Sequence, residues 1–196
     1  MEGEKTTLQS DRQLVFRCKT SYKRLLIIQN INHRGKNMFK IMFVCHGNIC
    51  RSPMAEFIFK DLVKRKGLDD KYLVQSSATS TEEIWGNVGN PVYPPAREEL
   101  KKHGIDCANK HAVQVTRADY EKYDLLVTMD SNNVRNLISI IGSDPEGKVH
   151  KLLSFAGRSD DVSDPWYTRD FTTCYNDIFE GCEALLNHLE RGYKNA

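Results

Sequence analysis

The sequence predicts an α/β protein built around a parallel sheet. Short apolar runs with the length of buried strands alternate along the chain with longer segments of helical periodicity. Strands separated by helices in this way form parallel sheets with right-handed crossovers. A short loop containing two cysteines, a glycine and an arginine, residues 45–52, directly follows the first apolar run. Because ligands of such sheets bind beyond the carboxyl ends of the strands, this loop occupies the expected place of a functional site.

Length and charge set the class of protein. A chain of 196 residues can form one domain with a sizeable core. Residues 1–37 contain eight Lys and Arg against three Asp and Glu, which leaves 20 basic and 23 acidic residues for the remainder. A main domain without excess positive charge argues against nucleic-acid binding. No apolar run approaches the ~20 residues of a membrane-spanning helix, so we expect no membrane partner either.

The chain divides near residue 38. Residues 1–37 are basic and weakly patterned, and we interpret them as an extension that is disordered or not part of the fold, including the case of a start site placed too far upstream. A docking arm or an organelle-targeting segment are the alternatives, although the early acidic residues weaken the second. Residues 38–196 are expected to form a single domain.

The first half of this domain has a clear order of elements. Residues 39–44 are predicted to be strand one, and residues 53–66 a helix with Pro53 at its first position and Gly67 after its end. A second strand begins at residues 72–74 and leads into a hydroxyl-rich run. The inward face of the helix is expected to contain Met54, Phe57, Ile58, Leu62 and Val63.

The second half continues the alternation after a loop rich in glycine and proline. Its buried strand is 124–129, and a weaker fourth strand is 149–153. A loop of glycine, serine, aspartate and proline precedes the last helix. The predicted helices are 95–103, 116–122 capped by Thr116, 131–141 ended by Gly142, and 171–189.

Cysteine usage indicates a reducing compartment. The six cysteines lack the spacing of a disulfide scaffold, so we interpret them as reduced thiols of a cytoplasmic protein. His103, Cys107 and His111 are spaced four apart, as metal ligands on a helix would be. Gly104 is expected to end the helix before that spacing can apply, so we expect no metal and no cofactor.

The chemistry of the loop follows from its length. Cys45 and Arg51 enclose five residues, and a loop this short curls back on itself around the thiol. Its backbone N–H groups, the positive end of the following helix and the Arg51 guanidinium would together bind a dianion above the sulfur. The same groups favour the thiolate, which is the nucleophilic form of cysteine. This combination suits phosphoryl transfer through a phosphocysteine.

Such a reaction also needs an acid from a second segment. Asp164 is the candidate, because Pro165 stiffens the turn that presents it and Trp166 and Tyr167 could wall a pocket for an aryl group. The alternative interpretation is a plain surface turn, which Asp-Pro often forms.

The loop and the distant Asp-Pro pair together resemble the low-molecular-weight protein tyrosine phosphatases, over about residues 38–190. This resemblance implies a three-layer α/β/α fold with a four-stranded parallel sheet in the order 2-1-3-4 and the phosphate-binding loop after strand 1. Further matching stretches are 76–80, 89–91, 103–105, 114–116, and Met129 and Asp130 with Asn132 close by.

The resemblance also implies roles for single residues. Cys45 would attack phosphorus, Arg51 would bind the phosphoryl oxygens, and Asp164 would protonate the leaving group and then activate water. Asn48 would hold a left-handed backbone in the loop, with Ser76 supporting it. Ser52 would hydrogen-bond the thiolate, and Asp130 would orient Arg51. The residues expected to contact phosphate or substrate are Gly47, Asn48, Ile49, Cys50, Ser52, Trp166 and Tyr167.

The chain departs from the family pattern at its pocket. Glu82 stands where relatives often carry an aromatic residue, and Trp85 lies in a slightly longer loop. Lys110 replaces a family histidine, so the network behind Asn48 is expected to differ. Trp166 replaces the tyrosine of many relatives and keeps an aromatic side chain.

The expected function is hydrolysis of phosphotyrosine in protein substrates by a monomer or weak homodimer. Three other functions remain open. The first is hydrolysis of phosphoarginine, although relatives specific for it tend to carry threonine where this loop has Ile49. The second is thiol-coupled arsenate reduction, which needs two further cysteines close in sequence, whereas Cys107 and Cys174 are far apart. The third is a phosphopeptide-binding module without activity, which the presence of a full catalytic set argues against.

Cys50 could form a reversible disulfide with Cys45, or be a small buried residue.

Overall fold

The computed structural model describes residues 38–194, and the predicted basic extension, residues 1–37, lies outside the described residues. Of these, residues 38–190 fall in one compact unit. No helix in the described part of the chain is long and apolar enough to cross a membrane. The prediction of one domain over residues 38–196 stays a prediction.

A four-stranded parallel sheet lies at the centre of this unit. Its strands are β1 (Phe39–Cys45), β2 (Tyr72–Ala78), β5 (Leu125–Thr128) and β6 (Val149–Lys151). The order is β2-β1-β5-β6 and every pairing is parallel. This is the predicted 2-1-3-4 arrangement, because β3 (Ile84–Trp85) and β4 (Val88–Gly89) form a separate two-stranded sheet. The central strand β1 is buried along most of its length, and its carboxyl end leads directly into the loop.

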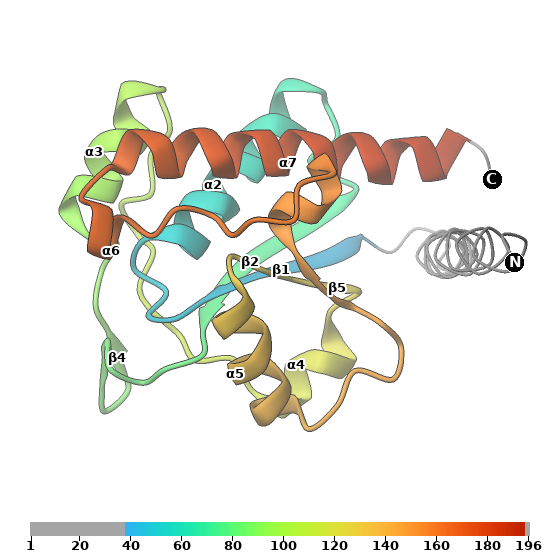
Figure 1. Ribbon diagram of the computed structural model, residues 1–196. Coiled ribbons are helices and arrows are strands. Elements are labelled where there is room, and N and C mark those ends of the chain that lie inside the picture. The colour runs from blue at the N-terminus through green and yellow to red at the C-terminus, as the bar shows by residue number, and fades with distance from the viewer. Residues whose placement is uncertain (1–37, 195–196) are drawn as a thin grey trace, which may run out of the picture. The chain divides into compact units, whose positions relative to one another are not determined.

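Helices cover both faces of the sheet and confirm the three-layer prediction. Figure 1 shows α2 (Arg51–Arg65) and α7 (Phe171–Lys194) on one face and α4 (Arg117–Lys122) and α5 (Ser131–Ile141) on the other. One core cluster packs between the sheet and α4 and α5, around Met42, Val44, Tyr123, Leu126 and Leu137. The helices are α2 (Arg51–Arg65), α3 (Pro94–Lys102), α4 (Arg117–Lys122), α5 (Ser131–Ile141), α6 (Pro165–Thr168) and α7 (Phe171–Lys194).

The prediction for α2 was wrong in two details. The helix begins at Arg51, so Pro53 is its third residue, because the Met54 N–H already donates to the Cys50 carbonyl at 3.0 Å. Phe57 is only partly buried, whereas Phe59 is fully buried and packs on Phe43. The physical reason is that α2 lies between the sheet and α7, where the Cys182 thiol contacts the Ala55 carbonyl at 3.7 Å. Its buried face is therefore wider than a single amphipathic stripe.

Three further elements differ from the prediction. Strand β6 ends at Lys151, and a 3-10 helix, η1 (Leu152–Ala156), buries the two leucines that were assigned to the strand. The glycine-rich loop contains a short hairpin of β3 (Ile84–Trp85) and β4 (Val88–Gly89). The turn after Asp164 is the helix α6, because Pro at the first helical position and an aspartate cap favour a helical start.

Candidate active site

The loop from 46 to 50 joins β1 to α2 and places Cys45 and Arg51 at its two ends. Cys45 is the last residue of β1 and is 3% exposed. Its sulfur lies 2.9 Å from the Ser52 hydroxyl and accepts the Asn48 backbone N–H at 3.3 Å. Both groups can donate a hydrogen bond to a sulfur that carries negative charge.

Asn48 holds the loop in its tight conformation. Its φ of 57° is left-handed, a region that Asn tolerates better than most residues. The side-chain amide donates to the Ser52 and Ser76 hydroxyls, at 2.9 Å each, and its oxygen accepts the Val113 backbone N–H at 3.1 Å. The carboxyl end of β2 thus supports the loop, because Ser76 lies on that strand beside β1.

A buried acid–base pair lies behind Ser76. The Ser76 hydroxyl donates to Glu56 at 2.6 Å, and the Lys110 ammonium donates to the Ser76 carbonyl at 2.8 Å. Lys110 is 3.4 Å from the Glu56 carboxylate, whose side chain is 5% exposed. Burial lowers the pKa of Lys110, although the nearby Glu56 opposes that shift. The network behind Asn48 therefore contains a lysine, as the sequence indicated, and also Glu56, which sequence reasoning missed.

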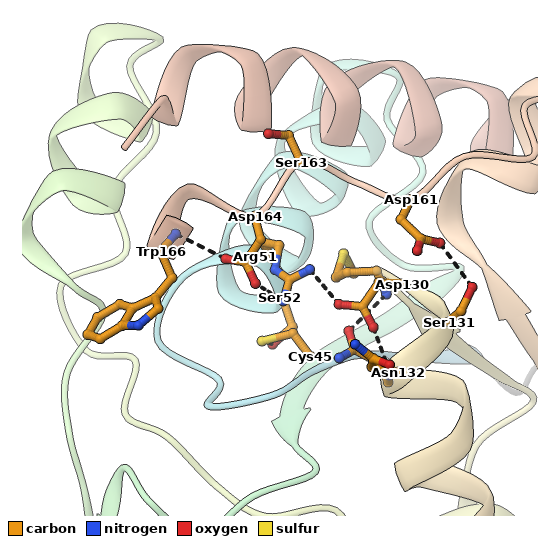
Figure 2. Close-up of polar contacts among 12 residues, drawn as sticks. Cys45, Arg51, Ser52, Asp130, Ser131, Asn132, Asp161, Ser163, Asp164 and Trp166 are labelled. Carbon is orange, nitrogen blue, oxygen red and sulfur yellow. Dashed lines mark hydrogen bonds and ion pairs between the residues drawn. The ribbon is translucent and has the colours of Figure 1, made fainter. Parts of the chain in front are cut away.

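The Arg51 guanidinium is held between two carboxylates. One terminal nitrogen is 2.7 Å from Asp130 and the other is 2.6 Å from Asp164 (Figure 2). Burial alone would lower the pKa of Arg51, but the charges of Cys45, Asp164 and Asp130 raise it, so the side chain stays cationic. Asp130 is itself fixed, because it caps α5 by accepting the Asn133 N–H at 2.6 Å.

Asp164 lies at the start of α6, far along the chain from the loop. It caps α6 by accepting the Trp166 N–H at 3.0 Å through one carboxylate oxygen, while its other oxygen contacts Arg51. Figure 2 shows Asp164 and Asp130 on opposite sides of the Arg51 side chain. The side chain is 28% exposed, so it can meet both a bound ligand and water.

A cavity of about 420 Å³ opens above the thiol. Trp166 forms part of its wall, is packed edge-on against Tyr93 at 6.0 Å and lies under the Arg169 guanidinium at 5.5 Å. Tyr167 also lines the cavity but is 82% exposed. The remaining lining residues are Cys45, His46, Gly47, Ile49, Cys50, Arg51, Glu82, Glu83, Asp130, Asn132, Asn133, Asn136 and Asp164.

Several of these lining residues were not predicted. No sequence pattern marked Glu83, Asn133 or Asn136 as residues of the cavity. Glu83 lies in the loop after β2, and the two asparagines lie in the first turns of α5. Glu82 pairs with His46 at 2.9 Å, so an acidic residue occupies part of the rim. Trp85 does not line the cavity and is 73% exposed, which leaves the aromatic wall to Trp166 and Tyr167.

Cys50 belongs to the pocket but differs chemically from Cys45. Burial, together with the negative charges of Cys45 and Asp164, raises the pKa of the Cys50 thiol to about 12. Cys50 is therefore mostly protonated near neutral pH, so it does not compete with Cys45 in the attack on phosphorus.

A larger cavity of about 540 Å³ lies beside α3 and contains Cys107. Burial raises the pKa of that thiol too, which makes it a poor nucleophile near neutral pH. Within residues 38–194, no three His, Cys, Asp or Glu side chains are grouped to hold a metal ion.

The arrangement combines three functions around one cavity. A buried sulfur lies at its floor, a fixed cation lies beside the sulfur, and a carboxylate from a second segment reaches the same cation. These groups can attack a tetrahedral anion, stabilise its charge and transfer a proton.

Comparison with known proteins gives consistent relatives. The sequence profile described as "Low molecular weight phosphotyrosine protein phosphatase" matches residues 40–195. The low molecular weight protein-tyrosine-phosphatase YfkJ of Bacillus subtilis is 38% identical over 156 residues, 79% of this chain and 97% of YfkJ. A low molecular weight phosphotyrosine protein phosphatase of Gallus gallus is 38% identical over 151 residues, 74% of this chain and 92% of that protein.

Solved structures agree with these relatives. The crystal structure of YfkJ superposes with a TM-score of 0.75 and covers 81% of this chain and 98% of YfkJ. A mutant of the YwlE arginine phosphatase with a phosphorylated active-site serine is 27% identical, with a TM-score of 0.67, over 78% of this chain and 97% of YwlE.

Proposed function

Because this chain belongs to the low molecular weight phosphotyrosine protein phosphatase family, we propose that it hydrolyses phosphotyrosine in proteins through a phosphocysteine on Cys45. The observation that carries the proposal is the position of Arg51, whose guanidinium is fixed between Asp130 and Asp164 at the mouth of the thiol loop. Residues 38–196 would act as one phosphatase domain, as a monomer or weak homodimer, because every group named for the reaction comes from one chain.

In the first step, the Cys45 thiolate attacks phosphorus and the bond to the phenolic oxygen breaks. The phosphoryl dianion displaces Asp164 from one guanidinium nitrogen of Arg51 and binds that nitrogen itself. Asp130 remains in contact with the other nitrogen. Loop N–H groups between Gly47 and Ser52 bind the equatorial oxygens. Asp164, in its protonated form, donates its proton to the leaving phenolate.

In the second step, water replaces the thiol. The Asp164 carboxylate, left ionised by the first step, takes a proton from a water molecule that attacks the phosphocysteine. Cys45 leaves as a thiolate, which the Ser52 hydroxyl at 2.9 Å and the Asn48 N–H stabilise. Inorganic phosphate is released and Asp164 again holds a proton.

Substrate choice follows from the walls of the cavity. Trp166 and Tyr167 offer aromatic faces to a phenyl ring, and Ile49 adds a branched apolar side chain where a phosphoarginine enzyme would need room for a guanidinium. Arsenate reduction is the weaker alternative, since Cys107, Cys174 and Cys182 do not line the cavity, and no two of them are close in sequence.

The expected kinetic result is a preference for phosphotyrosine. With phosphotyrosine, phosphoserine and phosphoarginine peptides of one sequence, kcat/KM should be at least about 100-fold higher for phosphotyrosine, because only its aryl group can pack on the aromatic wall of Trp166 and Tyr167. A higher rate on phosphoarginine would instead favour the arginine phosphatase function. Arsenate turnover coupled to thioredoxin would favour the reductase.

We also propose a cytoplasmic, redox-sensitive enzyme. All five cysteines of the described part of the chain are free thiols, as in a reducing compartment. A peroxide would oxidise the Cys45 thiolate to a sulfenic acid, which the Cys50 thiolate would convert to a disulfide with release of water. The disulfide would protect Cys45 from further oxidation until a cellular thiol reduces it.

The rate of this disulfide formation should rise with pH. Burial raises the pKa of Cys50, so near neutral pH its thiolate fraction grows about tenfold for each pH unit. Mass spectrometry of peroxide-treated protein between about pH 6 and pH 8 would measure the rate. A Cys50→Ser variant should inactivate without recovery on adding a reducing thiol, whereas Cys107→Ser should recover. Reversible inactivation of Cys50→Ser would contradict the proposal.

A further inference from the structure

The β3–β4 hairpin starts in the wall of the cavity and extends away from it. Glu82 and Glu83 line the cavity, and β3 begins at the next residue, Ile84. Trp85 ends β3 and lies two residues beyond Glu83, which is about 7 Å along an extended chain. A substrate polypeptide that places a phosphorylated side chain in the cavity must therefore pass close to the hairpin.

The hairpin presents an apolar pair to solvent. Trp85 and Val88 are directly opposite each other across the two strands, and they are 73% and 68% exposed. Side chains paired in this way lie about 5 Å apart and form one continuous surface. A large aromatic residue exposed beside an active-site cavity is typical of a surface that binds a partner.

This surface is held rigidly. A Cβ on Gly89 would lie 1.9 Å from the Ala112 carbonyl oxygen, so the hairpin rests directly against that segment. The Asn90 N–H donates to the Glu83 carbonyl at 2.8 Å and closes the base of the hairpin, and the Ala112 N–H donates to the Asn90 carbonyl at 2.9 Å. A fixed surface loses little conformational entropy when a partner binds it.

The charge at the start of the hairpin identifies the partner further. The Glu82 side chain is 71% exposed at the rim, where it contacts His46, and the Glu83 side chain lies against Gly47 of the phosphate-binding loop. Arg51 is the single Lys or Arg among the described residues that line the cavity. Two carboxylates beside a site for a dianion disfavour acidic substrates, and a cation next to the phosphoryl group would compensate them.

We propose that the hairpin docks the polypeptide of the phosphotyrosine substrate, with Glu82 and Glu83 binding a Lys or Arg beside the phosphotyrosine and Trp85 with Val88 binding an apolar side chain farther along. This inference rests on the proposed function. Counted from the phosphotyrosine, the spacing along the hairpin places the basic residue at the first position and the apolar residue at about the third. The enzyme thus selects basic, apolar sequences through the acidic rim of the cavity and the exposed hairpin beyond it.

Two phosphotyrosine peptides and one small substrate test the proposal on the full chain. The first peptide carries lysine at the first and leucine at the third position on both sides of the phosphotyrosine, and the second carries serine at those positions. The wild-type kcat/KM should be about tenfold higher for the first peptide. Tenfold corresponds to about 1.4 kcal/mol, which burial of roughly 55 Å² of apolar surface supplies.

Variants locate the preference on the hairpin. Trp85→Ser should lose most of the preference and keep its kcat/KM on p-nitrophenyl phosphate within about twofold, because Trp85 lies outside the cavity. Trp85→Phe should retain the preference. Glu82→Gln should lower kcat/KM for the lysine peptide several-fold, whereas Glu121→Gln, an exposed charge change on α4, should not.

The outcomes separate the two proposals. Equal wild-type kcat/KM for the two peptides would overturn docking by the hairpin and leave tyrosine phosphatase activity standing. Failure to hydrolyse either phosphotyrosine peptide would overturn both. The comparison of the two peptides uses the wild-type enzyme, so it tests the proposal even if Trp85→Ser folds poorly.

Discussion

A Cys45→Ser variant is expected to lose at least about 10⁴-fold in turnover of aryl phosphates while keeping its fold. A serine hydroxyl can accept the same Asn48 N–H and contact the same Ser52 hydroxyl as the thiol does, so the loop geometry should persist. Near neutral pH, however, the hydroxyl stays protonated and is a weak nucleophile. Hydrolysis of p-nitrophenyl phosphate, with circular dichroism to verify folding, measures the effect.

A second buried thiol provides the matched control. Cys107→Ser makes the same chemical change outside the catalytic cavity and should retain hydrolysis. Activity of Cys45→Ser close to that of the wild type would eliminate the phosphocysteine intermediate and with it the assignment of the loop as the reacting site.

An Asp164→Asn variant should lose about 10²- to 10⁴-fold in turnover. Asparagine is also a good helix cap, so α6 and the position of Trp166 should be preserved. The amide cannot supply the proton that the leaving oxygen needs. The loss should therefore be greater for phenyl phosphate, whose leaving group is the more basic, than for p-nitrophenyl phosphate. Steady-state kinetics on the two substrates measure this difference.

The leaving-group comparison also distinguishes two roles of Asp164. Its carboxylate contacts Arg51 at 2.6 Å, so the variant could act through a misplaced guanidinium. Equal losses on both substrates would indicate that positioning role and would contradict proton donation. Asp160→Asn, which removes an exposed carboxylate from the same connection, should leave both rates unchanged.

The strand, loop and helix around Cys45 could be predicted because their signals are local. A buried apolar run, five residues of loop and a helical start are all determined by neighbouring side chains and backbone preferences. The parallel sheet was predicted for a similar reason, since alternating elements leave few topologies open. The width of the buried face of α2 was not predictable, because it depends on the contact with α7.

By itself, the sequence determined the fold class and the residues that form the loop, and its resemblance to a known family implied the sheet order. Only the tertiary structure decided how distant segments complete the site. It places Asp130 and Asp164 on the two sides of Arg51, Glu56 and Lys110 behind Ser76, and Glu82 and Glu83 at the rim. Apart from Glu56, which lies in α2 just after the loop, these partners are separated from the loop by long stretches of chain, so packing rather than local propensity determines which of them meet. The acidic rim and the exposed Trp85 belong to the same class of features, and they identify the surface on which substrate selection can be tested.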